Sequence, residues 1–89
     1  MVNSQIFFSM TTGEFNEKWK SYLEYGHYGM AIDNPKVIEY LDKEFEKEVK
    51  NNEGFTFSQI KTKFGSSRVY CSSDKSFEWE MEIDQLLKE

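Results

Sequence analysis

The sequence predicts an α+β fold in which a small, mostly antiparallel sheet packs against about three helices within a single domain, residues 1–89. Three segments repeat apolar residues at helical spacing, and the segments around them have the short, aromatic and β-branched character of strands. The chain also contains eight Phe, five Tyr and two Trp, which can fill the thin core of an 89-residue domain.

A first strand is expected at residues 4–10, where a short apolar run is bounded by polar residues. A helix at residues 13–25 should follow, because Thr11 and Glu14 have the spacing of a capping box. Gly26 is expected to end this helix, since glycine is the commonest residue just past a helix C-terminus.

A second helix is expected at residues 35–50. Pro35 suits the first helical position, and either Asp33 or Asn34 can cap the helix. The preceding GMAID stretch is interpreted as a connector or a brief strand.

A β-hairpin is expected at residues 55–64 and 68–73. A two- or four-residue loop centred on Ser66–Ser67 would place Phe64 opposite Val69. This register separates apolar from cationic side chains, whereas a three-residue loop would mix them. The inward face should hold Ile60, Thr62, Phe64, Val69 and Cys71, and the outward face Lys61, Lys63 and Tyr70, with Arg68 beside the turn.

The tail has two interpretations. Residues 76–85 alternate apolar and acidic residues as a strand does, yet Trp79, Ile83 and Leu86 also fit a helical stripe. A helix at residues 75–88 is expected, because Glu, Met and Leu favour helices and Ile83 alone is β-branched.

The hairpin segment, residues 59–70, resembles part of a family of small, uncharacterised bacterial and phage proteins. Their pattern reads approximately QIKEKFGGLRFY and is followed by an acidic, helix-like tail. Ser66–Ser67 replace Gly–Leu of the pattern, and the N-terminal half shows no clear match. The resemblance implies a hairpin followed by a helix and a connection to phages, but no activity. The matching residues are Gln59, Ile60, Lys61, Lys63, Phe64, Gly65, Arg68 and Tyr70.

Charge is unevenly distributed along the chain, whose formal net charge is −5. Residues 54–75 contain four cations and one acid, whereas residues 33–53 and 76–89 carry net charges of −3 and −4. The ordinary interpretation is internal complementarity, in which the hairpin cations lie near the flanking acids and each exposed pair contributes about 0–1 kcal/mol. The alternative is a binding face for phosphate, a nucleotide or an acidic protein.

These patterns favour a small, acidic, non-enzymatic interaction protein that binds a larger protein. Size, acidity and the resemblance together suggest a phage-encoded inhibitor of a host defence or nucleic-acid-processing protein. The alternative is a protein that binds or sequesters a small anionic ligand such as a nucleotide, for which a homodimer would enclose more volume. The candidate binding residues are Lys61, Lys63, Arg68 and Tyr70 of the hairpin and His27 and Tyr28 of the YGHYG stretch.

No catalytic, cofactor or metal site is expected. One His and one Cys cannot build a zinc cluster of usual composition, and no nucleophile-elbow or phosphate-cradling motif occurs. The negative net charge disfavours nonspecific nucleic-acid binding. No apolar run approaches the roughly 20 residues of a membrane span, and no secretory signal is seen. A cytoplasmic location is therefore predicted, in the host cytoplasm if the protein is phage-encoded.

Overall fold

The computed structural model describes residues 10–24 and 28–89. Three α-helices and a three-stranded sheet form within this part of the chain, so the expected α+β class is confirmed. The elements are α1 (Thr12–Lys18), the 3-10 helix η1 (Lys20–Tyr22), β1 (Gly29–Met30), α2 (Pro35–Asn51), β2 (Phe57–Lys63), β3 (Ser66–Cys71) and α3 (Ser76–Lys88).

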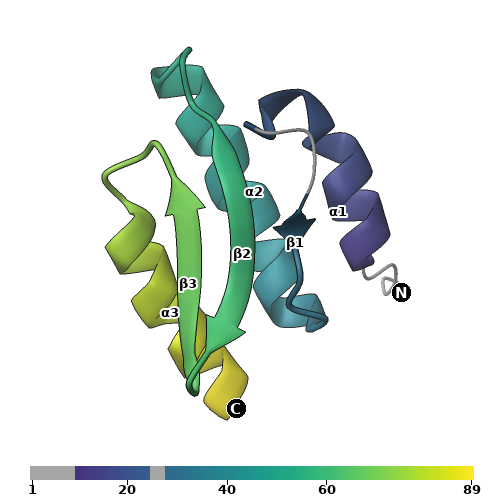
Figure 1. Cartoon of the computed structure of the whole chain (residues 1–89), viewed down its shortest axis with the longest axis vertical. Helices are drawn as coiled ribbons and strands as arrows, with labels where there is room; N and C mark the ends of the chain where they lie inside the picture. Colours follow the sequence, from purple (N-terminus) through teal and green to yellow (C-terminus); the bar gives the residue numbers. More distant parts are fainter. Residues whose placement is uncertain (1–9, 25–27) are drawn as a thin grey trace, which may run out of the picture.

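The sheet is mixed and has the strand order β1-β2-β3 (Figure 1). β1 runs parallel to β2 because α2 crosses over between them, whereas β2 and β3 form the expected antiparallel hairpin. The GMAID stretch therefore contributes a brief strand. The strand expected at residues 4–10 lies outside the described residues except for Met10, which is not in a strand.

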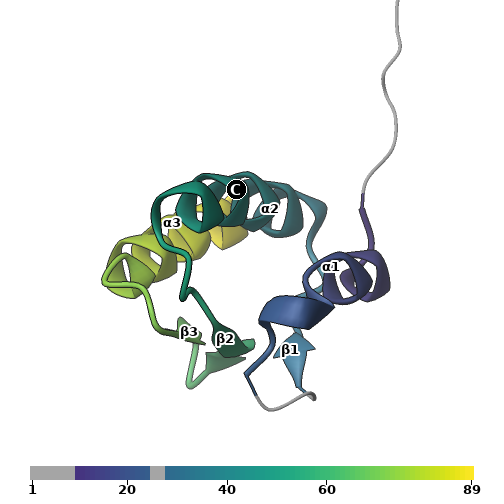
Figure 2. The ribbon, with the colours of Figure 1, turned by 90° about the horizontal axis from the view of Figure 1, so that it is seen from above.

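The helices α2 and α3 cover one face of the sheet, and α1 lies beside β1 (Figure 2). Phe45 of α2 is at the centre of the core, where its ring contacts an aromatic ring from each neighbouring layer. The ring centroids lie 5.4 Å away for Phe15 of α1, 5.0 Å for Phe57 of β2 and 5.5 Å for Trp79 of α3. Aromatic residues thus unite the layers of this small domain, as their number predicted.

The first helix is shorter than expected. Its capping box forms, with the Glu14 N–H donating to Thr11 Oγ1 at 3.1 Å and the Thr11 N–H to Glu14 Oε1 at 2.9 Å. The α-helix nevertheless ends at residue 18, because the chain becomes extended at Leu23. There it bridges to Phe57, and the Glu24 N–H donates to the Phe57 carbonyl oxygen at 2.7 Å. Pairing with β2 therefore replaces the expected last helical turn.

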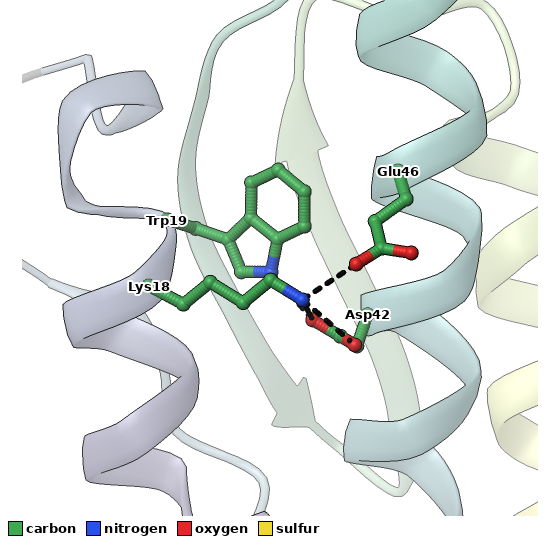
Figure 3. Close-up of polar contacts among 4 residues, drawn as sticks. All are labelled: Lys18, Trp19, Asp42 and Glu46. Atoms are coloured by element: carbon green, nitrogen blue, oxygen red, sulfur yellow. Dashed lines mark hydrogen bonds and ion pairs between the residues drawn. The ribbon is translucent and has the colours of Figure 1, made fainter.

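Polar contacts hold α1 against α2 (Figure 3). Lys18 Nζ lies 2.9 Å from Asp42 Oδ1 and 2.6 Å from Glu46 Oε2, and the indole N–H of Trp19 donates to Asp42 Oδ1 at 2.9 Å. The hydrogen bond to Glu46, followed by that to Asp42, raises the pKa of Lys18. Two acids of α2 are thus engaged by the neighbouring helix.

The other two helices agree with the sequence expectation. Asn34 caps α2, accepting from the Lys36 N–H at 3.0 Å, and Pro35 occupies the first position. The tail is a helix, not a strand, and Trp79 and Ile83 form its buried stripe.

Candidate binding face on the hairpin

The hairpin turns two residues earlier than expected. β2 and β3 join at Phe64–Gly65, so that Ile60 lies opposite Val69 and the expected pairing of Phe64 with Val69 is wrong. The reason is Gly65, whose φ of +81° lies in the left-handed region that a two-residue hairpin turn requires. A turn at the two serines would have given this conformation to residues with a Cβ.

The predicted division into two faces survives this shift. Moving the turn by two residues changes the partners of residues 59–63 by an even number of positions, so these side chains and those of their β3 partners keep their sides. Beyond them, a register irregularity between Phe57 and Gln59 shifts the pairing by one residue. Ile60 and Val69 are buried beneath the helices, and Lys61 and Arg68 lie on the opposite face. No described segment covers that face (Figure 2). Two residues expected on the inward face are exposed instead of buried. Phe64 sits in the turn and is 93% exposed, and Thr62, which lies opposite Ser67 near the turn, is exposed as well.

Three cations gather on this uncovered face. Lys61 lies directly opposite Arg68, and Lys63 follows Lys61 by two residues on the same strand. Directly opposed Cβ atoms are about 4.5–5.5 Å apart, and residues i and i+2 of a strand are about 7 Å apart. Like charges in opposed positions are unfavourable. We call Lys61, Lys63, Arg68 and Tyr70 the hairpin face.

Neighbouring groups orient two of the cations. Arg68 Nη1 donates to Ser66 Oγ at 2.7 Å and to the Ser67 carbonyl oxygen at 3.1 Å, which directs the guanidinium along its own strand toward the turn. Lys61 Nζ lies 5.9 Å from the centroid of the Tyr70 ring, within range of a cation–π contact. The hairpin face therefore combines an oriented guanidinium with an ammonium beside a 42% exposed aromatic ring.

None of the three hairpin cations forms an ion pair with any residue that the structure describes. Lys50, Lys75 and Lys88 share this property, but none of them lies on the sheet. Two of these lysines lie in the last turn of a helix, where the helix dipole favours a cation. No direct ion pair with the flanking acids therefore neutralises the hairpin cations within the part of the chain that the structure describes.

Two acids of α3 bind the backbone of β3 instead. The Val69 N–H donates to Glu80 Oε2 at 2.8 Å. Asp84 Oδ1 accepts from both the N–H of Ser67 at 2.9 Å and its hydroxyl at 2.7 Å. The sequence places these acids only in the acidic, alternating stretch of residues 76–85. Their i, i+4 spacing was the available signal, since it places both on one side of the helix.

An open groove of about 550 Å³ lies at the end of the hairpin away from the turn. Of the predicted binding residues that the structure describes, Tyr70 alone lines it. Two carboxylates, Glu24 and Glu80, also line it, together with the hydroxyl-bearing residues Ser58 and Ser72. The carboxylates make this groove unfavourable for a phosphate, although the neighbouring face is cationic.

The YGHYG stretch is described only in part. Tyr28 precedes β1 with a φ of +77° and is 64% exposed. Since Gly29 pairs with Gln59 and Gln59 with Tyr70, Tyr28 lies at the Tyr70 end of the hairpin face, away from the turn. His27 lies outside the described residues, so its predicted binding role stays a prediction.

The thiol of Cys71 is half-buried at the end of β3. Burial raises its pKa, and Sγ lies 3.8 Å from the Ser73 carbonyl oxygen, to which it donates. This environment disfavours the reactive thiolate. In residues 10–24 and 28–89, no group of three or more His, Cys, Asp or Glu side chains is placed to hold a metal ion. Nor is any helix there long and apolar enough to cross a membrane.

No protein-family model matches this sequence, and comparisons with curated proteins and with solved structures found no similar protein. Function must therefore be inferred from the chain's own residues.

Proposed function

We propose that this protein is a non-enzymatic binding protein whose hairpin face docks on an acidic surface of a larger protein. The observation that carries the proposal is the cross-strand pair of Lys61 and Arg68, which has no counter-ion among the described residues. This arrangement is unfavourable in the isolated chain. An acidic partner would convert the repulsion into an attraction that fixes orientation and speeds association.

The shape of the surface favours a protein partner over a nucleotide. The hairpin cations lie on an uncovered sheet face, whereas small-ligand sites are concave and bury most of their ligand. The nearby groove carries Glu24 and Glu80, which would repel a phosphate. An extended acidic surface can reach Lys61, Lys63 and Arg68 together without needing a pocket.

The biological setting belongs to the same proposal. The resemblance of residues 59–70 to small bacterial and phage proteins suggests a phage-encoded inhibitor, with a host defence or nucleic-acid-processing protein as its target. Two acids of α2 are bound by α1, and two acids of α3 are bound by the backbone of β3. We therefore expect the hairpin, not the acidic helices, to contact the partner.

The proposal can be tested with a photocrosslinking amino acid at Tyr70, introduced into the full chain and activated in host cells. The same group at Phe77, which is 70% exposed on α3, is the matched control. Adducts that form from Tyr70 and not from Phe77 would be identified by mass spectrometry, and the captured protein would be produced in recombinant form.

The Kd of that recombinant protein for the full chain then tests the proposal. We expect the Kd to rise with salt and to rise at least about tenfold in the double variant Lys61→Gln, Arg68→Gln. An unchanged Kd in the double variant, or the absence of any Tyr70-specific adduct, would refute the proposal. Stabilisation of the chain by ATP or GTP in a thermal-shift assay would instead support the small-ligand alternative.

A further inference from the structure

The hairpin turn contains a backbone conformation that its residue does not favour. Phe64 has a φ of +54° and Gly65 a φ of +81°, the positive values that a type I′ turn requires at both central positions. Asn or Asp is the usual first residue of such a turn, because a bulky side chain is strained in the left-handed region. A phenylalanine here is the least expected feature of an otherwise regular hairpin.

The strained residue also gains no burial in the fold. Phe64 is 93% exposed, more than any other large apolar side chain that the structure describes. The ammonium of Lys63 lies near the ring, with Nζ 5.7 Å from the ring centroid. Folding therefore explains neither the choice of residue nor its position at the tip.

We propose that Phe64 is the anchor of the hairpin face and inserts into an apolar pocket on the acidic partner. This inference rests on the proposed function and specifies the partner's chemistry. The pocket is wide enough for a phenyl ring and carries a carboxylate at its rim, where it meets Lys63. A buried aromatic surrounded by charged contacts is the usual composition of an interaction hot spot. Strained residues also concentrate at functional sites.

The variant Phe64→Asn separates an anchor from a structural residue, because the two roles predict opposite changes in stability. Asn followed by Gly is the preferred type I′ pair, so we expect the melting temperature to rise by about 4 °C or more. A phenylalanine that supported the fold would give a lower melting temperature when replaced, and that result would overturn the inference.

Binding is measured with peptides recovered from a random dodecapeptide display library that is selected on the immobilised full chain. We expect acidic peptides that contain aliphatic or aromatic residues. The Phe64→Asn variant should bind them at least about 30-fold more weakly, as loss of a hot spot does. Phe77→Asn is the matched control, since Phe77 is also exposed but lies on α3, and it should leave the Kd unchanged.

The outcomes distinguish this inference from the proposed function. Acidic peptides that lose affinity for the double variant Lys61→Gln, Arg68→Gln but not for Phe64→Asn would overturn the anchor and keep the binding face. Selected peptides that lack acids, or a selection that enriches no peptide, would overturn both. Equal losses for Phe64→Asn and Phe77→Asn would indicate general hydrophobic adhesion and overturn the anchor.

Discussion

The outer edge of β3 and the hairpin face both include residues of β3, yet acids bind one of them and not the other. Along the edge, Glu80 and Asp84 of α3 accept hydrogen bonds from the backbone N–H groups of Val69 and Ser67. On the face, Arg68 lies between those two residues in sequence, and no described acid forms an ion pair with it. Two acids of α3 therefore bind the backbone of β3 and leave the hairpin cations available.

The spacing of residues along a helix and along a strand explains why these two acids bond to the backbone of β3. Residues i and i+4 of a helix lie about 6 Å apart along its axis, and residues i and i+2 of a strand lie about 6.6 Å apart. The pair Glu80 and Asp84 therefore matches the pair Val69 and Ser67, and α3 replaces a fourth strand. Unpaired edge groups would otherwise invite another chain to pair with them.

At the opposite edge of the sheet, formed by β1, a neutral side chain bonds to the strand backbone in a similar way. Asn16 of α1 accepts from the Met30 N–H at 2.7 Å and donates to the Met30 carbonyl oxygen at 3.3 Å. Gly29 permits this approach, since a Cβ there would lie 2.6 Å from Asn16 Oδ1. With side chains bonded along both edges, a partner that adds a strand has little to pair with, which again favours the hairpin face.

The largest effect that we expect comes from breaking the closed edge. Asp84→Ala would remove the acceptor for two donors of Ser67, which is only 1% exposed. A buried donor without a partner costs about 1–3 kcal/mol, so the free energy of unfolding should fall by about 2–3 kcal/mol, measured by urea denaturation. Asp84→Asn keeps an acceptor oxygen and should lose less. Equal losses in both variants would show that charge, not hydrogen bonding, closes the edge.

The sequence predicted the face better than the edge, for a physical reason. Alternation along a strand assigns Lys61 and Tyr70 to one side for any loop with an even number of residues, because an even shift preserves the assignment. The hydrogen-bond partners of Glu80 and Asp84 depend instead on where α3 lies relative to β3, which no local pattern specifies. The parallel pairing of β1 with β2 was missed for the same reason, since it joins segments 30 residues apart.

Phe64 was misassigned because hydrophobicity was given more weight than turn chemistry. An apolar residue in an alternating run was assumed to point inward, although the glycine that follows it is a turn signal. The structure places that glycine at a position with φ of +81° and Phe64 beside it in the turn. A conflict between a residue's local preference and its observed place often marks a functional site.

A smaller effect should appear at alkaline pH and concerns Tyr40 of α2. Burial, followed by the charges of Glu44, Glu82 and Glu78, raises the pKa of Tyr40 from 10.0 to about 12. Tyr40 therefore stays neutral in the folded state at pH values where it ionises in the unfolded chain. Its stabilising contribution is complete below pH 10 and is lost as the pH rises to about 12.

We expect this loss to amount to about 1 kcal/mol, because partial exposure weakens the effect of the neighbouring charges. Urea denaturation at several pH values between 10 and 12 would measure it, and Tyr40→Phe should flatten the pH dependence. The pKa of Lys18 is also raised, so its stabilising contribution is likewise lost as the pH rises above 10.5. That loss should remain in the Tyr40→Phe variant. A Tyr40→Phe profile identical to that of the unmodified chain would contradict the assignment.

The smallest change in stability bears most directly on the contrast between edge and face. Lys61→Glu would put a carboxylate directly opposite Arg68 and give the face the counter-ion that it lacks. We expect the free energy of unfolding to rise by about 0.5 kcal/mol, because an opposed like-charge pair becomes an opposed ion pair. Lys61→Gln is the matched control, since it removes the cation opposite Arg68 without supplying a carboxylate, and it should bring a smaller gain. Both variants should bind the acidic partner more weakly.

A Lys61→Glu chain that is less stable than its parent would mean that the cations do not repel each other across the strands, and the main support for the binding face would be lost.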